Sequence, residues 1–129
     1  MTEERSTNID VDLLVCTHRR LDSLHRLIQS LFAARLFPGI SARLVIVNND
    51  TSPLTISPQS SGQHLNIVIL NEPTLGLSHA RNAAIAAASA GWMVFLDDDQ
   101  TVGEDFFENV WRAARTVFDP EPYAAVIHK

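Results

Sequence analysis

The chain has 129 residues, 46% of them hydrophobic and 19% charged, so it is long enough for one domain with its own core and too short for two. The net charge is −5, and the basic residues are nine arginines and one lysine, a composition that does not fit a nucleic-acid-binding protein. No apolar run approaches the roughly 20 residues of a membrane span, and a single cysteine excludes an intrachain disulfide and a cysteine-rich zinc site. Because the N-terminus is polar and acidic, unlike a signal peptide, we expect a cytoplasmic protein.

Apolar runs and turn signals divide the chain into alternating strands and helices. After a flexible tail at residues 1–10, short apolar runs predict buried strands at residues 11–16, 43–48, 65–70 and 92–96, and a fifth strand at 123–127. Apolar residues at helical spacing predict three helices: one that begins at residue 21 and is stopped by Pro38-Gly39, a second at 77–90 and a third at 104–118. The polar composition of residues 49–63 predicts a loop. Such strands, separated by helices, predict a mostly parallel sheet covered on both faces, which is a Rossmann-like α/β sandwich.

Polar side chains follow all four of the main predicted strands. The carboxyl ends of parallel strands meet at one edge of the sheet, where open α/β proteins bind their ligands. The sequence therefore predicts a site for a polar ligand or a metal at this edge, although any one of these segments could be an ordinary polar turn. The residues concerned are Thr17, His18 and Arg19; Asn48, Asn49, Asp50 and Thr51; Asn71 and Glu72; and Asp97, Asp98 and Asp99.

The three consecutive aspartates carry the most information. Their mutual repulsion after a buried strand has to be offset by a cation or by hydrogen-bond donors. If the extended backbone continues, Asp97 and Asp99 point to the same side and Asp98 to the other. Asp97 and Asp99 would then share a site whose oxygen ligands suit Mg²⁺ or Mn²⁺. The alternative is an acidic turn in which one aspartate caps the next helix.

Four segments in order resemble the glycosyltransferases of family 2. The segment Val11-Asp-Leu-Leu-Val-Cys-Thr-His-Arg-Arg20 is similar to the family's opening strand, which is followed by Pro-Thr-Tyr/His-Asn and an Arg. The segment Leu44-Val-Ile-Val-Asn-Asn-Asp-Thr-Ser52 is similar to the family's second strand, which ends in Val-Asp-Asp/Asn-Gly-Ser. The stretch from Asn71 to Asn82 is similar to the family's Asn-x-Gly-x-x-x-Ala-Arg-Asn segment, and Phe95-Leu-Asp-Asp-Asp99 contains the Asp-x-Asp motif. The family spacing is kept along nearly the whole chain.

The resemblance implies the GT-A fold, a nucleotide-sugar donor, usually linked to UDP or dTDP, and a Mn²⁺ or Mg²⁺ cofactor. It implies that Thr17 and Arg19 line the nucleoside pocket, and that Arg81, at the first turn of its helix, faces the nucleotide. It further implies that Asp97 holds the ribose or diphosphate side and, with Asp99, the metal. The remaining implied nucleotide-sugar contacts are Asn48, Asp50 and Asp98.

The chain departs from the family pattern at two positions, Asn48 and Cys16. Asn48 stands where the family has the acid that reads uracil; an amide can accept and donate hydrogen bonds but carries no charge. Cys16 replaces the usual proline, and we interpret it as a small hydrophobic residue at the end of a buried strand. His18 and His79 are not spaced as a ligand pair, so we predict that they are loop or helix-surface residues with at most a substrate contact.

Family members place acceptor recognition and the general base in a second half of the protein. We find no acid in this chain that would replace that base, so we expect residues 11–129 to form the donor-binding half, with the acceptor half truncated. The implied reaction transfers a sugar, with inversion, to a hydroxyl of a saccharide or lipid-linked acceptor; a lipid-linked acceptor would bring the protein to the inner face of the membrane.

Two alternatives differ in class from an active glycosyltransferase. One is an inactive remnant that binds a nucleotide sugar or a protein partner without turnover. The other is a phosphotransferase of the haloacid dehalogenase type, because Asp97-x-Asp99-x-Thr101 after a strand also fits that nucleophile motif. That motif normally lies on the first strand, with a lysine and further acids downstream, whereas the only lysine here is the last residue, Lys129.

Overall fold

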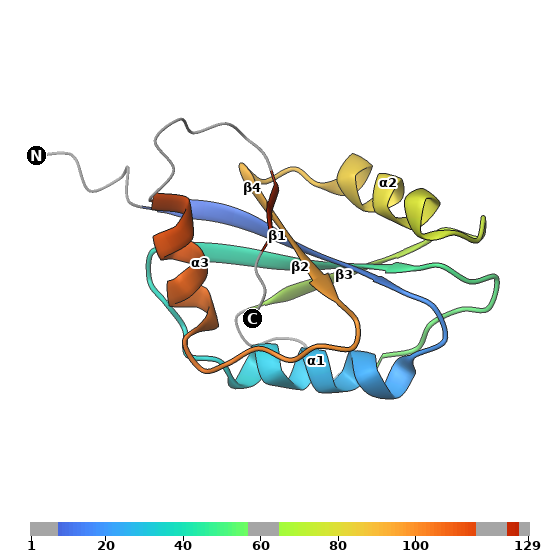
Figure 1. Cartoon of the computed structure of the whole chain (residues 1–129), viewed down its shortest axis with the longest axis horizontal. Coiled ribbons are helices and arrows are strands. Elements are labelled where there is room, and N and C mark those ends of the chain that lie inside the picture. The colour runs from blue at the N-terminus through green and yellow to red at the C-terminus, as the bar shows by residue number, and fades with distance from the viewer. Residues whose placement is uncertain (1–7, 57–64, 116–123, 127–129) are drawn as a thin grey trace, which may run out of the picture.

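The computed structural model describes residues 8–56, 65–115 and 124–126, in which strands and helices alternate. Figure 1 shows a sheet with helices on both faces, as the apolar pattern predicted. The elements are β1 (Ile9–Thr17), α1 (Leu21–Ala33), β2 (Ile40–Asn48), β3 (Asn66–Asn71), α2 (Leu77–Ala87), β4 (Trp92–Asp97), α3 (Phe106–Arg115) and β5 (Ala124–Val126).

The five strands form a parallel sheet in the order β3-β2-β1-β4-β5, with every neighbouring pair parallel (Figure 1). β1 lies at the centre and residues 11–15 of it are all buried, which explains why all of them except Asp12 are apolar. The register brings the polar strand ends level with each other: Thr17 is opposite Asn48, and Cys16 is opposite Asp97. The prediction that these ends share one edge is therefore confirmed.

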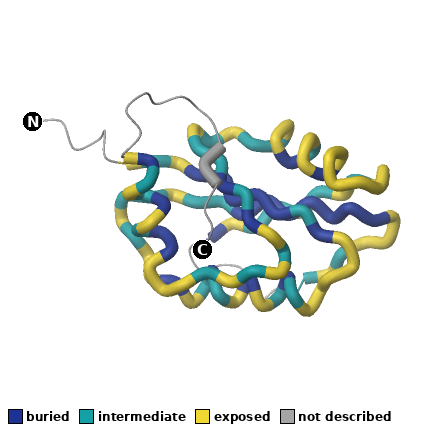
Figure 2. The backbone as a smooth tube through the Cα atoms, in the orientation of Figure 1, coloured by how far each residue is buried: buried dark blue, intermediate teal, exposed yellow. Residues whose placement is uncertain are grey.

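The two faces of the sheet are covered differently. Leu13 and Val15 of β1 point into the larger core, which α1 and α3 complete, whereas Leu14 points toward α2. α2 contributes only Ala80 and Ala84 as fully buried side chains, so its backbone can lie close to the sheet. Figure 2 shows the resulting layers, with buried strands in the middle and exposed outer surfaces on the helices.

Some predicted boundaries shift in the structure. β1 begins at Ile9, two residues inside the predicted tail, because Ile9 donates its N–H to the carbonyl of Gly39 and β1 pairs with β2 along nine residues. α2 ends at Ala87, three residues early, and α3 begins at Phe106. The predicted end of α3, at 116–118, and residues 1–7, 123 and 127 lie outside the described residues.

A buried aspartate, Asp12, explains the early end of α2. Asp12 in β1 is almost fully buried, and its carboxylate accepts hydrogen bonds from Arg43 Nε at 2.9 Å and Nη2 at 3.1 Å. Its Oδ2 also accepts the backbone N–H groups of Ser89 and Ala90, at 2.7 and 3.0 Å. These two amides therefore bind the carboxylate of β1 instead of continuing the helix. The ion pair lies toward the amino ends of the strands, away from the polar edge.

None of the helices in the described part of the chain is both long and apolar enough to cross a membrane.

Candidate functional site

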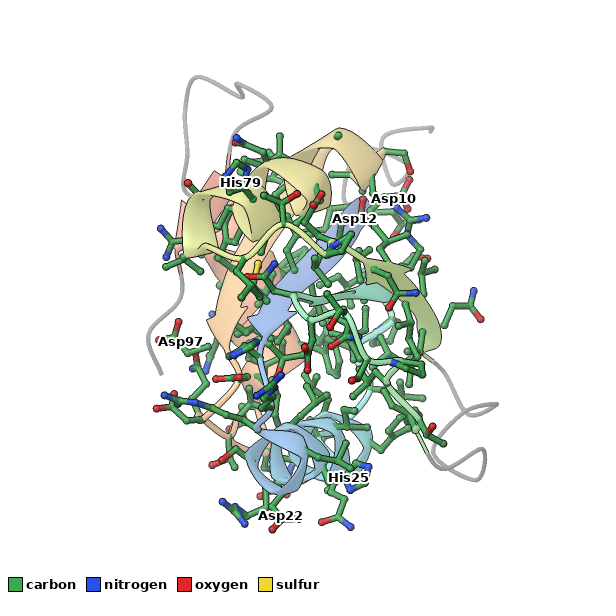
Figure 3. All side chains as sticks on the ribbon, turned by 90° about the vertical axis from the view of Figure 1, so that its right-hand side faces the viewer. Asp10, Asp12, Asp22, His25, His79 and Asp97 are labelled. Atoms are coloured by element: carbon green, nitrogen blue, oxygen red, sulfur yellow. The ribbon has the colours of Figure 1, made fainter. Side chains whose placement is uncertain are left out.

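A pocket of about 530 Å³ opens at the carboxyl ends of β1 and β4, beside the start of α2. Figure 3 looks onto this edge of the molecule, with α2 and His79 above, α1 with Asp22 below, and Asp97 at the end of β4 between them. The pocket is lined by Cys16, Thr17, His18, Arg20, Asn49, Leu75, Gly76, Leu77, Ala80, Arg81, Phe95, Leu96, Asp97, Asp98 and Asp99. Five of the eight residues predicted for the site therefore meet here: Thr17, Arg81, Asp97, Asp98 and Asp99.

The aspartate run is held to β1 by a hydrogen bond. The buried Thr17 hydroxyl donates to Asp98 Oδ2 at 2.9 Å, and the Asp98 side chain is only 13% exposed. β4 ends at Asp97, and a turn follows in which Gln100 Oε1 accepts the Asp97 backbone N–H at 2.6 Å. The predicted extended geometry thus stops at Asp97, although Asp98 is less exposed than either neighbouring aspartate, as strand alternation would have it.

Arg20 is the site residue that our sequence reasoning missed. Its Nη1 lies 3.4 Å from Asp99 Oδ2 and 3.6 Å from Asp98 Oδ1, so one guanidinium offsets part of the repulsion between these two carboxylates. The available signal was its place in the first motif, where it is the arginine that follows Cys-Thr-His-Arg. Sequence spacing alone gives no reason to pair it with a residue 79 positions away.

The structure places Arg19 and Asp50 beside the pocket and not in its lining. Arg19 Nε donates to Asp50 Oδ2 at 3.1 Å, and Arg19 adopts a φ of 56°, a left-handed conformation that is unusual for a residue other than glycine. The hydrogen bond from Arg19 lowers the pKa of Asp50, so this carboxylate stays charged. The left-handed turn sends the adjacent Arg19 and Arg20 to different acidic partners, at the ends of β2 and β4.

Asn48 is likewise outside the pocket lining and is buried. Its Nδ2 donates to the Ser52 carbonyl at 2.8 Å and to Asn71 Oδ1 at 3.1 Å, which ties the ends of β2 and β3 together. In this structure its amide N–H groups are therefore engaged with the protein itself.

Asn49, which we had noted only as a polar strand end, shapes the pocket. Its Nδ2 donates to the carbonyls of Glu72 and Thr74, at 2.7 and 2.8 Å, and its Oδ1 accepts the N–H of Gly76 at 3.0 Å. One buried side chain thus fixes the loop that leads into α2. Gly76 has a φ of 132°, a conformation that L side chains rarely adopt, and it directly precedes α2 in the pocket wall.

The two remaining features of the pocket wall are a thiol and an arginine. Cys16 is partly buried, and this burial raises the pKa of its thiol, as expected of a small apolar residue and not of a reactive thiolate. Arg81 is exposed on α2, and no carboxylate of residues 8–56, 65–115 or 124–126 lies within ion-pairing distance of it. Its charge is therefore available to an anionic ligand.

The three aspartates supply oxygen donors suited to Mg²⁺ or Mn²⁺. The described residues contain no group of three or more His, Cys, Asp or Glu side chains arranged to hold a metal ion. Such cations are commonly bound by one or two carboxylates together with substrate phosphates, so this donor set fits a cation that is shared with a ligand. It does not fit a preformed cage of protein ligands.

The chain is similar in sequence to known proteins. The family model for "Glycosyl transferase family 2" matches residues 12–119. The succinoglycan biosynthesis protein ExoM of Rhizobium meliloti (strain 1021) is 28% identical over 111 residues, which are 84% of this chain and 36% of ExoM.

Among solved structures, S. aureus TarS 1-349 is similar with a TM-score of 0.69 at 17% identity, covering 83% of this chain and 32% of that one. TarS 1-349 in complex with UDP-GlcNAc gives a TM-score of 0.69, again at 17% identity, over 83% of this chain and 31% of that one. These likenesses show the fold, the Rossmann-like sandwich of GT-A glycosyltransferases. The chain spans about a third of the length of these relatives.

Proposed function

Because the chain belongs to glycosyl transferase family 2, we propose that its pocket binds a nucleoside diphosphate sugar and serves as the donor site of a glycosyltransferase. One observation carries the proposal: the pocket at the carboxyl edge joins an available arginine, Arg81, to three carboxylates. An anionic diphosphate and three carboxylates repel each other unless cations lie between them. A site of this composition suits a diphosphate bound together with a divalent cation.

The wall formed by α2 suits the diphosphate. α2 begins at Leu77 in the pocket wall, directly after Gly76, and the first N–H groups of a helix attract anions. Arg81 follows on the same wall and would add a full positive charge for the phosphates. Thr17, at the end of β1, also lines the pocket and would lie on the nucleoside side, as the family resemblance implies. Arg19, Asn48 and Asp50 are outside the lining, so we propose that they support the neighbouring lining residues and do not touch the donor directly.

Asp97 and Asp99 are the residues we propose for the metal, since both are exposed in the pocket. When bound, Mg²⁺ or Mn²⁺ would act as a Lewis acid that stabilises the charge developing on the departing nucleoside diphosphate. Asp98, held by Thr17, would fix the turn that presents its two neighbours. The chain's own part in the reaction is thus to bind the donor, orient it and balance its charge.

The donor we propose carries uridine, with dTDP as the alternative. TarS has been solved with UDP and with UDP-GlcNAc, which supports uridine for a relative of this fold. ExoM is named for succinoglycan biosynthesis, which supports a polysaccharide or lipid-linked saccharide as the acceptor. A lipid-linked acceptor would also draw the protein to the membrane surface.

We assign no general base to this chain. The reaction we propose forms a bond from an acceptor hydroxyl oxygen to the sugar's anomeric carbon with inversion, breaks the bond to the diphosphate, and passes the hydroxyl proton to a base. Glu104, Asp105 and Glu108 do not suit that role, because Glu104 and Asp105 pair with Arg35, Glu108 pairs with Arg112, and none of the three lines the pocket.

A thermal-shift panel tests the proposal. The chain is heated with UDP, dTDP or GDP, each with and without Mn²⁺; a ligand at 100 times its Kd adds about 2.7 kcal/mol to the free energy of unfolding. We expect stabilisation by UDP that depends on Mn²⁺, is lost in Asp99→Asn and persists in Asp10→Asn, which removes an exposed carboxylate at the other end of β1. No shift with any nucleotide would contradict the donor site.

A further inference from the structure

Arg20 occupies the place where a cation would meet the aspartates. Building on the proposed donor site, we propose that Arg20 is a built-in counter-ion that the divalent cation displaces, so that metal and nucleoside diphosphate bind cooperatively. In the structure, the Arg20 guanidinium bridges Asp98 and Asp99, with Nη1 3.6 Å and 3.4 Å from their respective oxygens. Of these two carboxylates, Asp99 is also one of the two residues proposed to hold the metal, so the guanidinium and the metal would share it.

The backbone of Arg20 is held while its side chain stays accessible. The Arg20 carbonyl accepts the N–H of Leu24 at 2.9 Å at the start of α1, and the preceding residue, Arg19, is fixed by its pair with Asp50. The side chain of Arg20 is 56% exposed, and that of Asp99 is 59% exposed. An ion pair exposed to this degree contributes little to stability, so the guanidinium can leave Asp99 without unfolding the turn.

The carboxylates differ in how freely they can change partners. Asp98 is mostly buried and held by Thr17, so its orientation is set from the protein side. Asp99 has no such anchor: the hydrogen bond it makes in the described residues is the 3.4 Å contact with Arg20. A cation arriving at Asp99 therefore competes directly with one guanidinium, and their like charges disfavour occupancy of the same oxygens.

Once displaced from Asp99, the Arg20 guanidinium could bind the phosphates of the donor. Arg20 lines the pocket together with Arg81, so a released guanidinium would lie at a wall facing the proposed diphosphate. A guanidinium binds phosphate oxygens through paired N–H groups. Metal alone would then have to break the Arg20 pair without compensation, whereas metal with UDP would offer Arg20 a new anionic partner. The expected result is weak binding of the metal alone and coupled binding of the two ligands.

The test measures Mn²⁺ affinity by electron paramagnetic resonance, with and without UDP. In Arg20→Gln we expect Mn²⁺ alone to bind about fivefold more tightly than in the wild type, and the gain in Mn²⁺ affinity caused by UDP to shrink by at least that factor. Arg20→Lys, which keeps the charge, should bind Mn²⁺ alone as the wild type does. Arg26→Gln is the matched control, because it removes an exposed arginine of α1 that lies outside the pocket lining, and it should change neither value.

The outcomes separate this inference from the function on which it rests. If the wild type binds UDP with Mn²⁺ while Arg20→Gln has an unchanged or lower affinity for Mn²⁺ alone, the counter-ion role is wrong and the donor site stands. If no variant binds Mn²⁺ in any condition, the counter-ion role and the metal part of the proposed function both fail, and nucleotide binding without metal is judged from the thermal-shift panel. Circular dichroism of each variant checks that the fold is retained.

Discussion

Thr17 and Asp98 are joined by a 2.9 Å hydrogen bond across 81 positions of the sequence. The bond links the last residue of β1 to the first residue after β4, and both strands meet at the pocket. It fixes the one aspartate of the acidic run whose side chain is mostly buried. The pocket wall therefore depends on a contact between neighbouring strands of the sheet.

Thr17→Val should loosen this wall. Valine keeps the shape of threonine but leaves Asp98 Oδ2 without its donor, so we expect a loss of about 1 kcal/mol in the free energy of unfolding. We also expect the stabilisation by UDP and Mn²⁺ to decrease, because the acidic turn is no longer held. Chemical denaturation and thermal shift measure the two effects. Thr51→Val, at an exposed position outside the pocket lining, is the control; equal effects in the two variants would contradict this role for Thr17.

Asn49→Asp should disturb the loop that leads into α2 and forms part of the pocket wall. The substitution removes the amide N–H donors that bind the carbonyls of Glu72 and Thr74 and sets a charge against those oxygens. We expect a loss of about 2 kcal/mol or more in stability, since a buried hydrogen-bonded network is broken. UDP affinity should fall as well, measured by titration calorimetry. Asn109→Asp, the same change on the exposed side of α3, should alter neither quantity.

The Asp12–Arg43 pair predicts a specific dependence of stability on pH. Burial by itself would raise the pKa of Asp12, but hydrogen bonds from Arg43 and from two backbone amides outweigh it, and the pKa lies below its ordinary value. A carboxyl whose pKa is lowered by folding stabilises the protein above its unfolded-state pKa, about 3.9, and loses that contribution as the pH falls through the folded-state pKa. Asp12→Asn should therefore cost about 2 kcal/mol at pH 7, because hydrogen bonds to a charged carboxylate are lost while Arg43, 31% exposed, remains partly solvated.

Urea denaturation at a series of pH values checks this prediction. The difference between the wild type and Asp12→Asn should be constant from about pH 5 to pH 8 and should narrow below about pH 4. Asp10→Asn, two residues away and exposed, should differ little from the wild type at any of these values. A difference that is the same at pH 7 and pH 3 would show that the charge of Asp12 does not cause it.

Gly39→Ala should be destabilising because of the close approach of α3. A Cβ added at Gly39 would lie 2.6 Å from Trp111 Nε1 and 3.2 Å from the ring of Phe37, and these two rings pack against each other with centroids 5.0 Å apart. Neither ring can move without disturbing the other, so we expect a cost of about 1–3 kcal/mol. Gly91→Ala is the control, because no atom lies within 4 Å of the added Cβ. Thermal denaturation of the two variants should separate them clearly, and equal melting temperatures would contradict the packing argument.

Local sequence patterns were enough to predict the order of strands and helices and the edge of the sheet at which the site lies. Apolar runs such as residues 44–47 could be recognised because a strand buried on both faces needs a nearly continuous apolar sequence. The polar strand ends could be placed at one edge because parallel strands all point the same way. The grouping of Thr17, Arg81 and the aspartates in one pocket followed from these two rules and from the family resemblance.

The tertiary structure decided which polar side chains face the pocket and which bind to each other. The sequence could not separate Arg20, which lies over Asp98 and Asp99, from its neighbour Arg19, which turns to Asp50. It also could not show that Asp12, a charged residue inside an otherwise apolar strand, pairs with Arg43. The physical reason is that burial affects many neighbouring residues and so produces a recognisable apolar pattern in the sequence. An ion pair, in contrast, depends on one backbone turn and on one distance between residues that are far apart in the sequence. Those are fixed only when the sheet has formed.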